Sequence, residues 1–230
     1  MANRPGNAEK YNMNTVNKRL GHPLEGKHVL FLGSSVTLGS ASIEQGIPEY
    51  FAARFGCIPV KEAVCGTTLV DTGSDSYIHR LLHCPHITAA PDLVVCQLST
   101  NDATRGFPLG QITNTDAPEG FDTATITGAL EYILSYCSET LGCPVAFYTG
   151  SRYDSSLYGQ MVTRIHELQD KWNFTLLDLW SNDDFNNISP ELRALYMSDP
   201  IHPTKAGYRD WWCPEIERQL EEAEFLKPAN

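Results

Sequence analysis

The sequence predicts an α/β protein in which a parallel sheet is covered by helices on both faces. Short apolar runs alternate along the chain with segments that have helical periodicity. This alternation favours β-α-β units with right-handed crossovers, and therefore a parallel sheet. The run at 93–98 is almost continuously apolar, as is typical of a strand that is buried on both faces. Because composition shows no break and no repeat, we predict one domain over residues 27–230, preceded by a polar arm at 1–26.

Five apolar runs have the length and flanking residues of buried strands. They are residues 29–32, 60–64, 93–98, 145–148 and 174–177. The sequence therefore predicts a five-stranded sheet.

Amphipathic helices are predicted between and after these runs. Residues 123–141 place their apolar side chains on one stripe and are followed by Gly142, a typical helix stop. Ser42 and Gln45 predict a capping box for a helix that carries Tyr50, Phe51 and Phe55. After Pro203, apolar residues recur at every fourth position up to Leu220, which predicts a C-terminal helix.

Two segments show neither the apolar run of a strand nor the apolar stripe of a helix. They are residues 103–121 and 181–200. Loops of this length in a compact domain are usually functional or disordered. Both are expected at the carboxyl edge of the sheet, where open α/β folds bind their ligands.

Composition excludes several classes of protein. Apolar residues make up 42% and charged residues 20%, as in ordinary globular proteins, and no apolar run is long enough to span a bilayer. The net charge of -11 disfavours nucleic acid and anionic membranes as partners. Residues 1–26 lack the apolar stretch of a secretory signal, and the seven Cys form no Cys-x-x-Cys pair. Reduced cysteines such as Cys96 and Cys137 fit the core of a cytoplasmic protein.

The segment Asp199-Pro200-Ile201-His202 carries the strongest chemical signal. It places a carboxylate three residues before an imidazole, and its flanking prolines prevent a continuous helix. Such a pair suits a base and the group that orients it. The matching nucleophile is Ser35, directly after the first predicted strand, where His202 is expected to take its proton. The alternative is that Ser34, Ser35 and Thr37 only cap a helix.

Acyl transfer also needs hydrogen-bond donors for the developing oxyanion. Gly66 follows the second predicted strand, and its N–H is one candidate. Asn101 follows the third strand, and its side-chain amide is another. Each also has a simpler interpretation as a turn residue.

Taken in order, these residues resemble the SGNH (GDSL-type) hydrolase superfamily, which includes esterases, lipases and acylhydrolases. Gly33-Ser34-Ser35 is similar to the first block of the family, Gly66 to the second, Asn101-Asp102 to the third, and Asp199 to His202 to the last. The resemblance implies a flavodoxin-like, three-layer α/β/α sandwich. It also implies Ser35 as nucleophile, His202 as base and Asp199 as its orienting partner. The Ser35 N–H, Gly66 and Asn101 would form the oxyanion hole.

The chain departs from the family pattern at two positions. Ser34 stands where the family has the Asp of Gly-Asp-Ser, and Ser99 replaces the Gly of Gly-x-Asn-Asp. Neither change removes a catalytic group. The resemblance further suggests a short acyl substrate, such as an acetyl ester of a carbohydrate or another small alcohol. Aromatic residues that would suit the wall of its pocket are Phe107, Phe121, Tyr153 and Trp180.

Other signals are weaker. His79, His83 and His86 lie close together, but only Cys84 adds to the ligand set, so we expect no metal and no cofactor. Cys65, next to Gly66, is expected to line the site. The competing function is a flavodoxin-like flavin- or phosphate-binding protein, in which the loop that contains Ser34 and Ser35 cradles a phosphate. That hypothesis gives no role to Asn101 or to the Asp199/His202 pair.

Overall fold

The protein is built on one five-stranded, all-parallel sheet with the strand order β2-β1-β3-β4-β5. The computed structural model describes residues 3–84, 90–223 and 226. The strands are β1 (His28–Gly33), β2 (Ile58–Ala63), β3 (Leu93–Gln97), β4 (Val145–Tyr148) and β5 (Thr175–Leu177). All five predicted strands are therefore confirmed, each to within two residues at either end. The order is that of flavodoxin-like folds.

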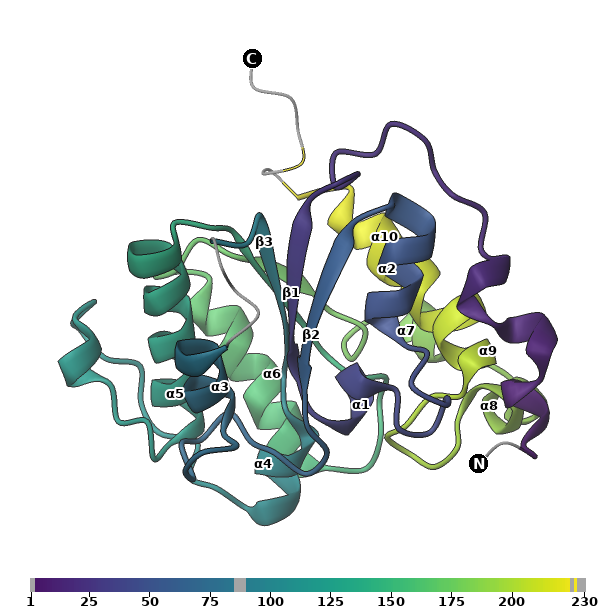
Figure 1. The fold of residues 1–230 in the computed structure, drawn as a ribbon. Helices are drawn as coiled ribbons and strands as arrows, with labels where there is room; N and C mark the ends of the chain where they lie inside the picture. The colour runs from purple at the N-terminus through teal and green to yellow at the C-terminus, as the bar shows by residue number, and fades with distance from the viewer. Residues whose placement is uncertain (1–2, 85–89, 224–225, 227–230) are drawn as a thin grey trace.

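Helices cover both faces of the sheet (Figure 1). One face carries α3 (Tyr77–His83), α5 (Ile126–Ser135) and α6 (Ser156–Leu168). The other carries α2 (Ile47–Phe55) and α10 (Cys213–Leu220). The shorter helices are α1 (Ser35–Leu38), α4 (Thr100–Arg105), α7 (Asp183–Asn186), α8 (Pro190–Tyr196) and α9 (Lys205–Gly207). The predicted three-layer α/β/α sandwich is thus confirmed.

Alternate strand residues enter two separate cores. Leu30 and Leu32 of β1 pack toward α3, α5 and α6, whereas Val29 and Phe31 pack toward α2 and α10. This is the two-residue period of a strand whose two faces are both buried. It explains why the central strands read as continuous apolar runs. Cys96 and Cys137 are fully buried in the first core, as predicted.

The predicted helix at 123–141 is present as α5 followed by a π-helical segment, η5 (Tyr136–Leu141), and Gly142 ends it in a left-handed conformation. The C-terminal helix is continuous through α9, η6 (Tyr208–Trp212) and α10. At Tyr136 and Tyr208 the hydrogen bonding changes from α to π, and the apolar side chains stay on the buried side.

Two expectations about local structure were wrong. The Ser42/Gln45 capping box does not form: α2 begins at Ile47, and Glu49 accepts the backbone N–H of Gly46 at 2.8 Å. Ser42 instead donates to the Gly39 carbonyl. Residues 181–200 are not a plain loop, because they contain α7 and α8, each capped by a side chain, Asn182 and Ser189.

Residues of the polar arm pack against the rest of the protein. Three 3-10 turns occupy Pro5–Asn7, Glu9–Tyr11 and Met13–Thr15. Met13 and Leu24 are buried in the second core. Asn7 accepts the backbone N–H of Lys205 at 3.0 Å, which ties the arm to the start of α9.

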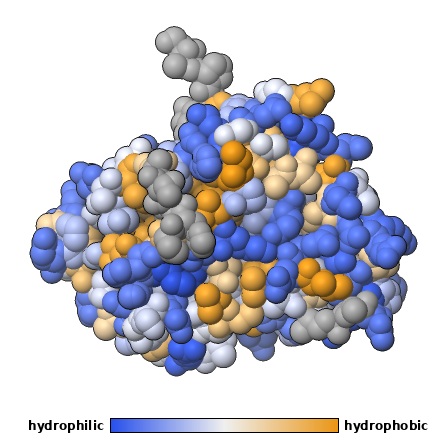
Figure 2. Space-filling view, viewed as in Figure 1, coloured by the Kyte–Doolittle hydropathy of each residue, from blue (hydrophilic) through white to orange (hydrophobic). Residues whose placement is uncertain are grey.

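Most of the surface in view is hydrophilic, with small, scattered hydrophobic areas (Figure 2). None of the helices in the described ranges is sufficiently long and apolar to cross a bilayer.

Candidate active site

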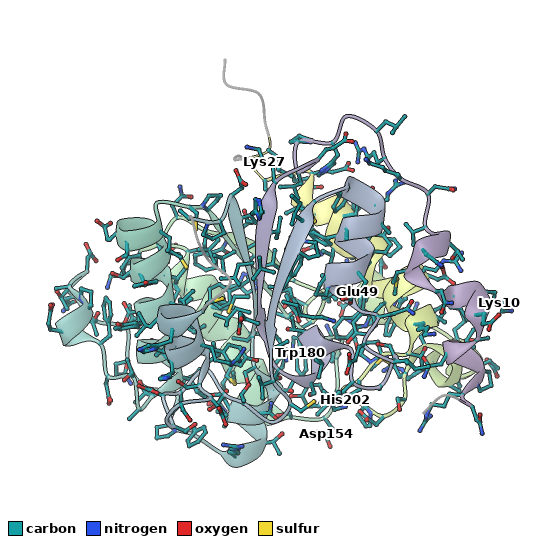
Figure 3. The ribbon with its side chains drawn as sticks, viewed as in Figure 1. Lys10, Lys27, Glu49, Asp154, Trp180 and His202 are labelled. Carbon is teal, nitrogen blue, oxygen red and sulfur yellow. The ribbon has the colours of Figure 1, made fainter. Side chains whose placement is uncertain are left out.

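Ser35, His202 and Asp199 meet at the carboxyl edge of the sheet. Ser35 Oγ lies 2.8 Å from His202 Nε2, although the two residues are 167 positions apart. His202 Nδ1 lies 2.9 Å from both carboxylate oxygens of Asp199. Figure 3 shows His202 at the opposite end of the sheet from Lys27, which directly precedes β1. The structure therefore brings together the three residues that were predicted to form the nucleophile, the base and its orienting partner.

The local backbone fixes the imidazole. Met197 and Pro203 form an antiparallel bridge, and Ser198 N–H donates to the His202 carbonyl at 2.8 Å, so the segment between them is a closed loop. Within it, Asp199 Oδ1 accepts the backbone N–H groups of Ile201 and His202 at 2.8 and 2.9 Å. The carboxylate therefore holds both the ring and the chain that carries it.

These contacts also set the ionisation of the pair. Burial raises the pKa of Asp199, but the backbone N–H groups of Ile201 and His202 and the His202 ring outweigh it, so the pKa is lowered on balance. An ionised Asp199 accepts a hydrogen bond from the Nδ1–H of His202, so that the proton stays on Nδ1 and the lone pair of Nε2 faces Ser35. The hydroxyl of Ser35 then donates to His202 Nε2.

Gly66 lies on the loop that follows β2, Asn101 lies in the first turn of α4 after β3, and Thr67 connects them. Asn101 Nδ2 donates to the Thr67 carbonyl at 2.9 Å, which leaves its second N–H for a ligand. In the part of the chain that the structure describes, the Gly66 N–H makes no hydrogen bond. Ser35 is the first residue of α1, so its N–H has no partner within that helix. Gly66 has φ of 78°, a conformation that favours glycine.

Arg80, which the sequence analysis did not single out, ties the Ser35 loop to the Gly66 loop. Its Nη2 donates to the Gly33 carbonyl at 2.8 Å and to Thr67 Oγ1 at 3.1 Å. Its Nη1 donates to the Glu62 carbonyl at the end of β2. Arg80 lies in α3 and its side chain is largely buried. In the sequence it looks like an ordinary polar residue of an amphipathic helix, so the sequence does not reveal its role.

Gln97, at the end of β3, was also missed, and it braces the nucleophile loop. Its Oε1 accepts the Ser34 N–H at 2.9 Å and the Thr37 hydroxyl at 2.9 Å, so it contacts the chain on both sides of Ser35. Gly33 allows this approach, because a Cβ there would overlap the Thr37 hydroxyl. The amide of Gln97 thus braces the loop in which Ser34 replaces the family aspartate.

Asp102 holds the Gly66 loop from a third direction. Its fully buried carboxylate accepts the backbone N–H groups of Leu69 and Val70 at 2.9 and 3.0 Å. Burial raises the pKa of Asp102, and the hydrogen bonds from Ser99 and from these two N–H groups only partly offset it. The group positions the loop and makes no contact with Ser35.

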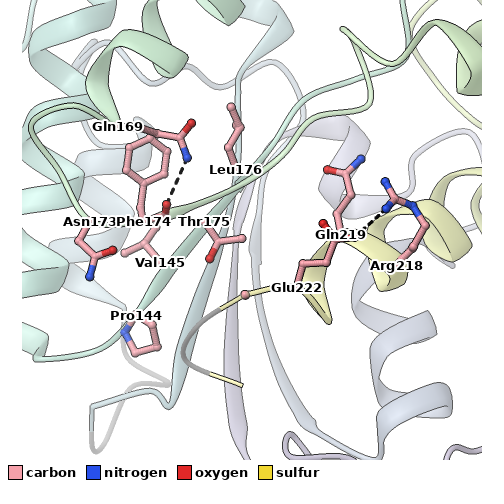
Figure 4. Close-up of a pocket in the computed structure, with 11 residues that line it drawn as sticks. Pro144, Val145, Gln169, Asn173, Phe174, Thr175, Leu176, Arg218, Gln219 and Glu222 are labelled. Atoms are coloured by element: carbon pink, nitrogen blue, oxygen red, sulfur yellow. Dashed lines mark hydrogen bonds and ion pairs between the residues drawn. The ribbon is translucent and has the colours of Figure 1, made fainter. Parts of the chain in front are cut away.

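Several hollows surround these residues. A mainly apolar groove of about 420 Å³ is lined by Tyr153, Met197, Asp199 and Pro200, but not by Ser35. A polar pocket of about 240 Å³ includes Gly66. A larger hollow, of about 490 Å³, lies at the amino ends of β4 and β5 and contains none of the predicted site residues (Figure 4).

The four aromatic residues expected to wall the pocket separate into two groups. Tyr153 and Trp180 contact each other edge to face, with 5.3 Å between ring centroids, and Tyr153 lines the apolar groove. Phe121 packs against Trp172, and Phe107 packs against the first core. Of the four, Tyr153 is the residue found in the lining of the apolar groove.

Of the remaining predicted groups, the structure describes two histidines of α3 and a cysteine beside Gly66. His79 and His83 stack on each other in α3, while His86 lies outside the described residues. Within those residues no cluster of three His, Cys, Asp or Glu has the arrangement of a metal site. Cys65 is exposed and lines the polar pocket beside Gly66.

The fold and this cluster together define a three-layer α/β/α protein of the hydrolase class, with a serine, a histidine and an aspartate in hydrogen-bond contact. The sequence matches the GDSL-like lipase/acylhydrolase family over residues 31–209. The chain belongs to this family, and the predicted resemblance is confirmed. Comparison with curated proteins gives no match.

Solved structures share the fold at low sequence identity. A protein from Lactobacillus plantarum is 20% identical, with a TM-score of 0.67, over 86% of this chain and 96% of that chain. A family two carbohydrate esterase from Cellvibrio japonicus is 17% identical, with a TM-score of 0.53, over 89% and 63%. A family two carbohydrate esterase from Clostridium thermocellum, solved with cellohexaose, is 13% identical, with a TM-score of 0.51, over 84% and 64%.

Proposed function

We propose that the protein is a serine esterase that hydrolyses short-acyl carboxylic esters through a covalent acyl-enzyme on Ser35. The observation that carries this proposal is the unbroken contact from Ser35 Oγ to His202 Nε2 at 2.8 Å, and from His202 Nδ1 to Asp199 at 2.9 Å. A nucleophile, its base and the group that orients the base are the parts that acyl transfer requires. Membership of a family of lipases and acylhydrolases supports the same reaction.

In the first half of the reaction, Ser35 Oγ attacks the ester carbonyl carbon while His202 Nε2 takes the hydroxyl proton. The carbonyl oxygen becomes an oxyanion, which the N–H groups of Ser35 and Gly66 and the Asn101 amide stabilise. His202 then donates its proton to the departing alcohol oxygen as the C–O bond breaks. The alcohol leaves, and the acyl group stays on Ser35.

In the second half, water replaces the alcohol. His202 takes a proton from the water molecule, whose oxygen attacks the acyl carbon. Collapse of the second oxyanion returns the proton to Ser35 Oγ and releases the carboxylic acid. Asp199 stabilises the imidazolium ion that forms in both halves.

Acetyl is the acyl group we propose. The apolar groove is lined by Asp199 and Pro200 but not by Ser35, which supports a small acyl group at the nucleophile. The relatives that are carbohydrate esterases support a carbohydrate or another small alcohol as the second part of the ester.

The test is hydrolysis of p-nitrophenyl acetate by the wild type and by Ser35→Ala. The wild type is expected to turn over the ester, and the variant to lose activity while its circular dichroism spectrum and unfolding midpoint are retained. Turnover near the wild-type rate in Ser35→Ala would refute the proposal. A series of p-nitrophenyl esters of increasing chain length tests the acyl group, because a preference for long chains would contradict the choice of acetyl.

A further inference from the structure

A polar pocket of about 240 Å³ lies beside the proposed oxyanion hole. Besides Cys65, its lining consists of Gly66, Thr67, Thr72, Ser74, Asp75 and Arg105. Gly66 belongs both to this pocket and to the set of proposed oxyanion donors. A ligand in this pocket would therefore contact the Gly66 loop, which carries one of the proposed oxyanion donors.

The pocket contains hydrogen-bonding groups that the protein itself does not use. In the described chain, neither the Asp75 carboxylate nor the Ser74 hydroxyl has a hydrogen-bond partner. Arg105 Nη2 donates to the Gly66 carbonyl at 2.7 Å, and the other N–H groups of the guanidinium make no hydrogen bond within the described residues. The pocket thus offers a charged acceptor, a charged donor and a hydroxyl.

The charges of Asp75 and Arg105 disfavour a ligand that carries a single charge. Asp75 and Arg105 carry opposite charges and form no ion pair with any group in the described residues. A ligand with a single charge can pair with only one of these two residues, and it leaves the other beside a like charge. A neutral group with several hydroxyls satisfies both residues, because hydroxyls donate to the carboxylate and accept from the guanidinium.

Size narrows the ligand further. The volume lies below the range of about 300–1,000 Å³ that is usual for sites of drug-sized ligands. One sugar ring or a comparably small polyol suits such a space, but an oligosaccharide does not. We propose that this pocket binds the alcohol part of the ester, and that this alcohol is a single polyhydroxylated ring.

This inference rests on the proposed esterase activity and assigns a substrate class to it. The overall reaction converts the ring ester and water into the free polyol and acetic acid. Asp75 and Arg105 do not exchange protons with the substrate; they bind hydroxyl groups that take no part in the bond changes. Their effect is therefore expected in KM rather than in kcat.

The experiment compares two esters with the same acyl group and a ring of the same size. The first kind of ester is a methyl pyranoside with one acetyl group, tested with the acetyl group at each ring position in turn. The second is cyclohexyl acetate, whose ring has no hydroxyls. The wild type is expected to hydrolyse at least one pyranoside acetate with a kcat/KM about tenfold or more above that for cyclohexyl acetate. Removal of a hydrogen bond to a charged group has an effect of about this size.

Asp75→Ala is the informative variant, since the Asp75 carboxylate makes no hydrogen bond or ion pair within the described residues and acts on Arg80 only through its charge. It is expected to lower kcat/KM for the pyranoside acetate about tenfold, through KM, and to leave cyclohexyl acetate within about twofold. Asp170→Ala is the matched control, because Asp170 is an exposed aspartate just after α6 and outside the site. Asp170→Ala is expected to leave kcat/KM unchanged for both substrates.

The proposal would be overturned if the wild type did not prefer any pyranoside acetate to cyclohexyl acetate. It would also be overturned if Asp75→Ala lowered kcat/KM equally for both substrates. Failure of the underlying esterase proposal looks different. In that case cyclohexyl acetate and p-nitrophenyl acetate would be turned over equally by the wild type and by Ser35→Ala.

Discussion

The side-chain oxygen of Gln97 lies 2.9 Å from the backbone nitrogen of Ser34, and so connects the end of β3 to the loop that presents Ser35. The same oxygen accepts the hydroxyl of Thr37 on the other side of Ser35. Both contacts are fully enclosed, since the exposed fraction of Gln97 is 2%. An amide on the neighbouring strand therefore fixes the position of the nucleophile loop.

Replacement of Gln97 by methionine tests this brace. Methionine has a similar shape but no side-chain acceptor, so the Ser34 N–H loses its partner, whereas the Thr37 hydroxyl keeps Tyr148 at 2.6 Å. Each buried donor left unsatisfied costs about 1–3 kcal/mol. We expect the free energy of unfolding, measured in urea, to fall by about this amount, and kcat for p-nitrophenyl acetate to fall about tenfold or more because Ser35 is less well positioned.

Gln169→Met is the matched control, since Gln169 is exposed at the end of α6. It should leave both quantities close to the wild type. Wild-type kcat in a folded Gln97→Met variant would show that the brace has no role in positioning Ser35.

His202 and Asp199 are expected to differ in importance. His202→Ala removes the base and should lower kcat/KM by about 10³-fold or more. Asp199→Ala leaves the imidazole, whose Nδ1 can still be held by a water molecule, so a loss of about 10–100-fold is expected, part of it because the N–H groups of Ile201 and His202 lose their acceptor. Steady-state kinetics on p-nitrophenyl acetate measure both. A larger loss in Asp199→Ala than in His202→Ala would reverse the assigned roles.

Activity should depend on pH through one proton. As the pH falls, His202 becomes protonated and can no longer accept the Ser35 proton. The pKa of Asp199 is lowered, so its carboxylate stays ionised below the usual range of aspartates. Its contribution to stability is then present above its unfolded pKa and is lost only as the pH falls through the lowered folded value.

The acid limb of log(kcat/KM) against pH should therefore have a slope close to one. A steeper limb would mean that Asp199 titrates together with His202. Activity that increases toward low pH would contradict a neutral imidazole as the base.

Arg80 is expected to be a positioning residue. It holds the Gly33 carbonyl and Thr67 at once, so Arg80→Lys, which cannot reach both, should lower kcat for p-nitrophenyl acetate about tenfold with little change in KM. Addition of guanidinium salts to an Arg80→Ala variant should restore part of kcat. An unchanged kcat in folded Arg80→Lys, or equal losses in kcat and in affinity, would point to a purely structural role.

The strand ends explain how much of this site the sequence could predict. Ser35, Gly66 and Asn101 each follow an apolar run, and parallel strands place such positions at one edge of the sheet. His202 and Asp199 follow a short helix and reach the same edge, which the order of the motifs indicated. These five residues were therefore identifiable before their geometry was known.

The residues that hold the nucleophile loop in place could not be identified from the sequence. Gln97 appears in the sequence only as a polar interruption of an apolar strand, and Arg80 as one polar residue of an amphipathic helix. Both act on backbone groups far along the chain, Gly33 and Ser34, so their roles depend on how β1, β3 and α3 pack. The missed helix α8 has a related cause: with no buried residue of its own, it shows no apolar stripe.

The reactivity of Ser35 toward a fluorophosphonate tests the central claim most directly, because such a reagent forms a stable adduct only with a serine that a neighbouring base activates. Intact-mass and peptide analysis of the treated wild type should find one adduct per chain, on Ser35. Ser35→Ala should give no adduct, and His202→Ala should react far more slowly. An adduct on another residue, or equal labelling of Ser35→Ala, would contradict Ser35 as the nucleophile.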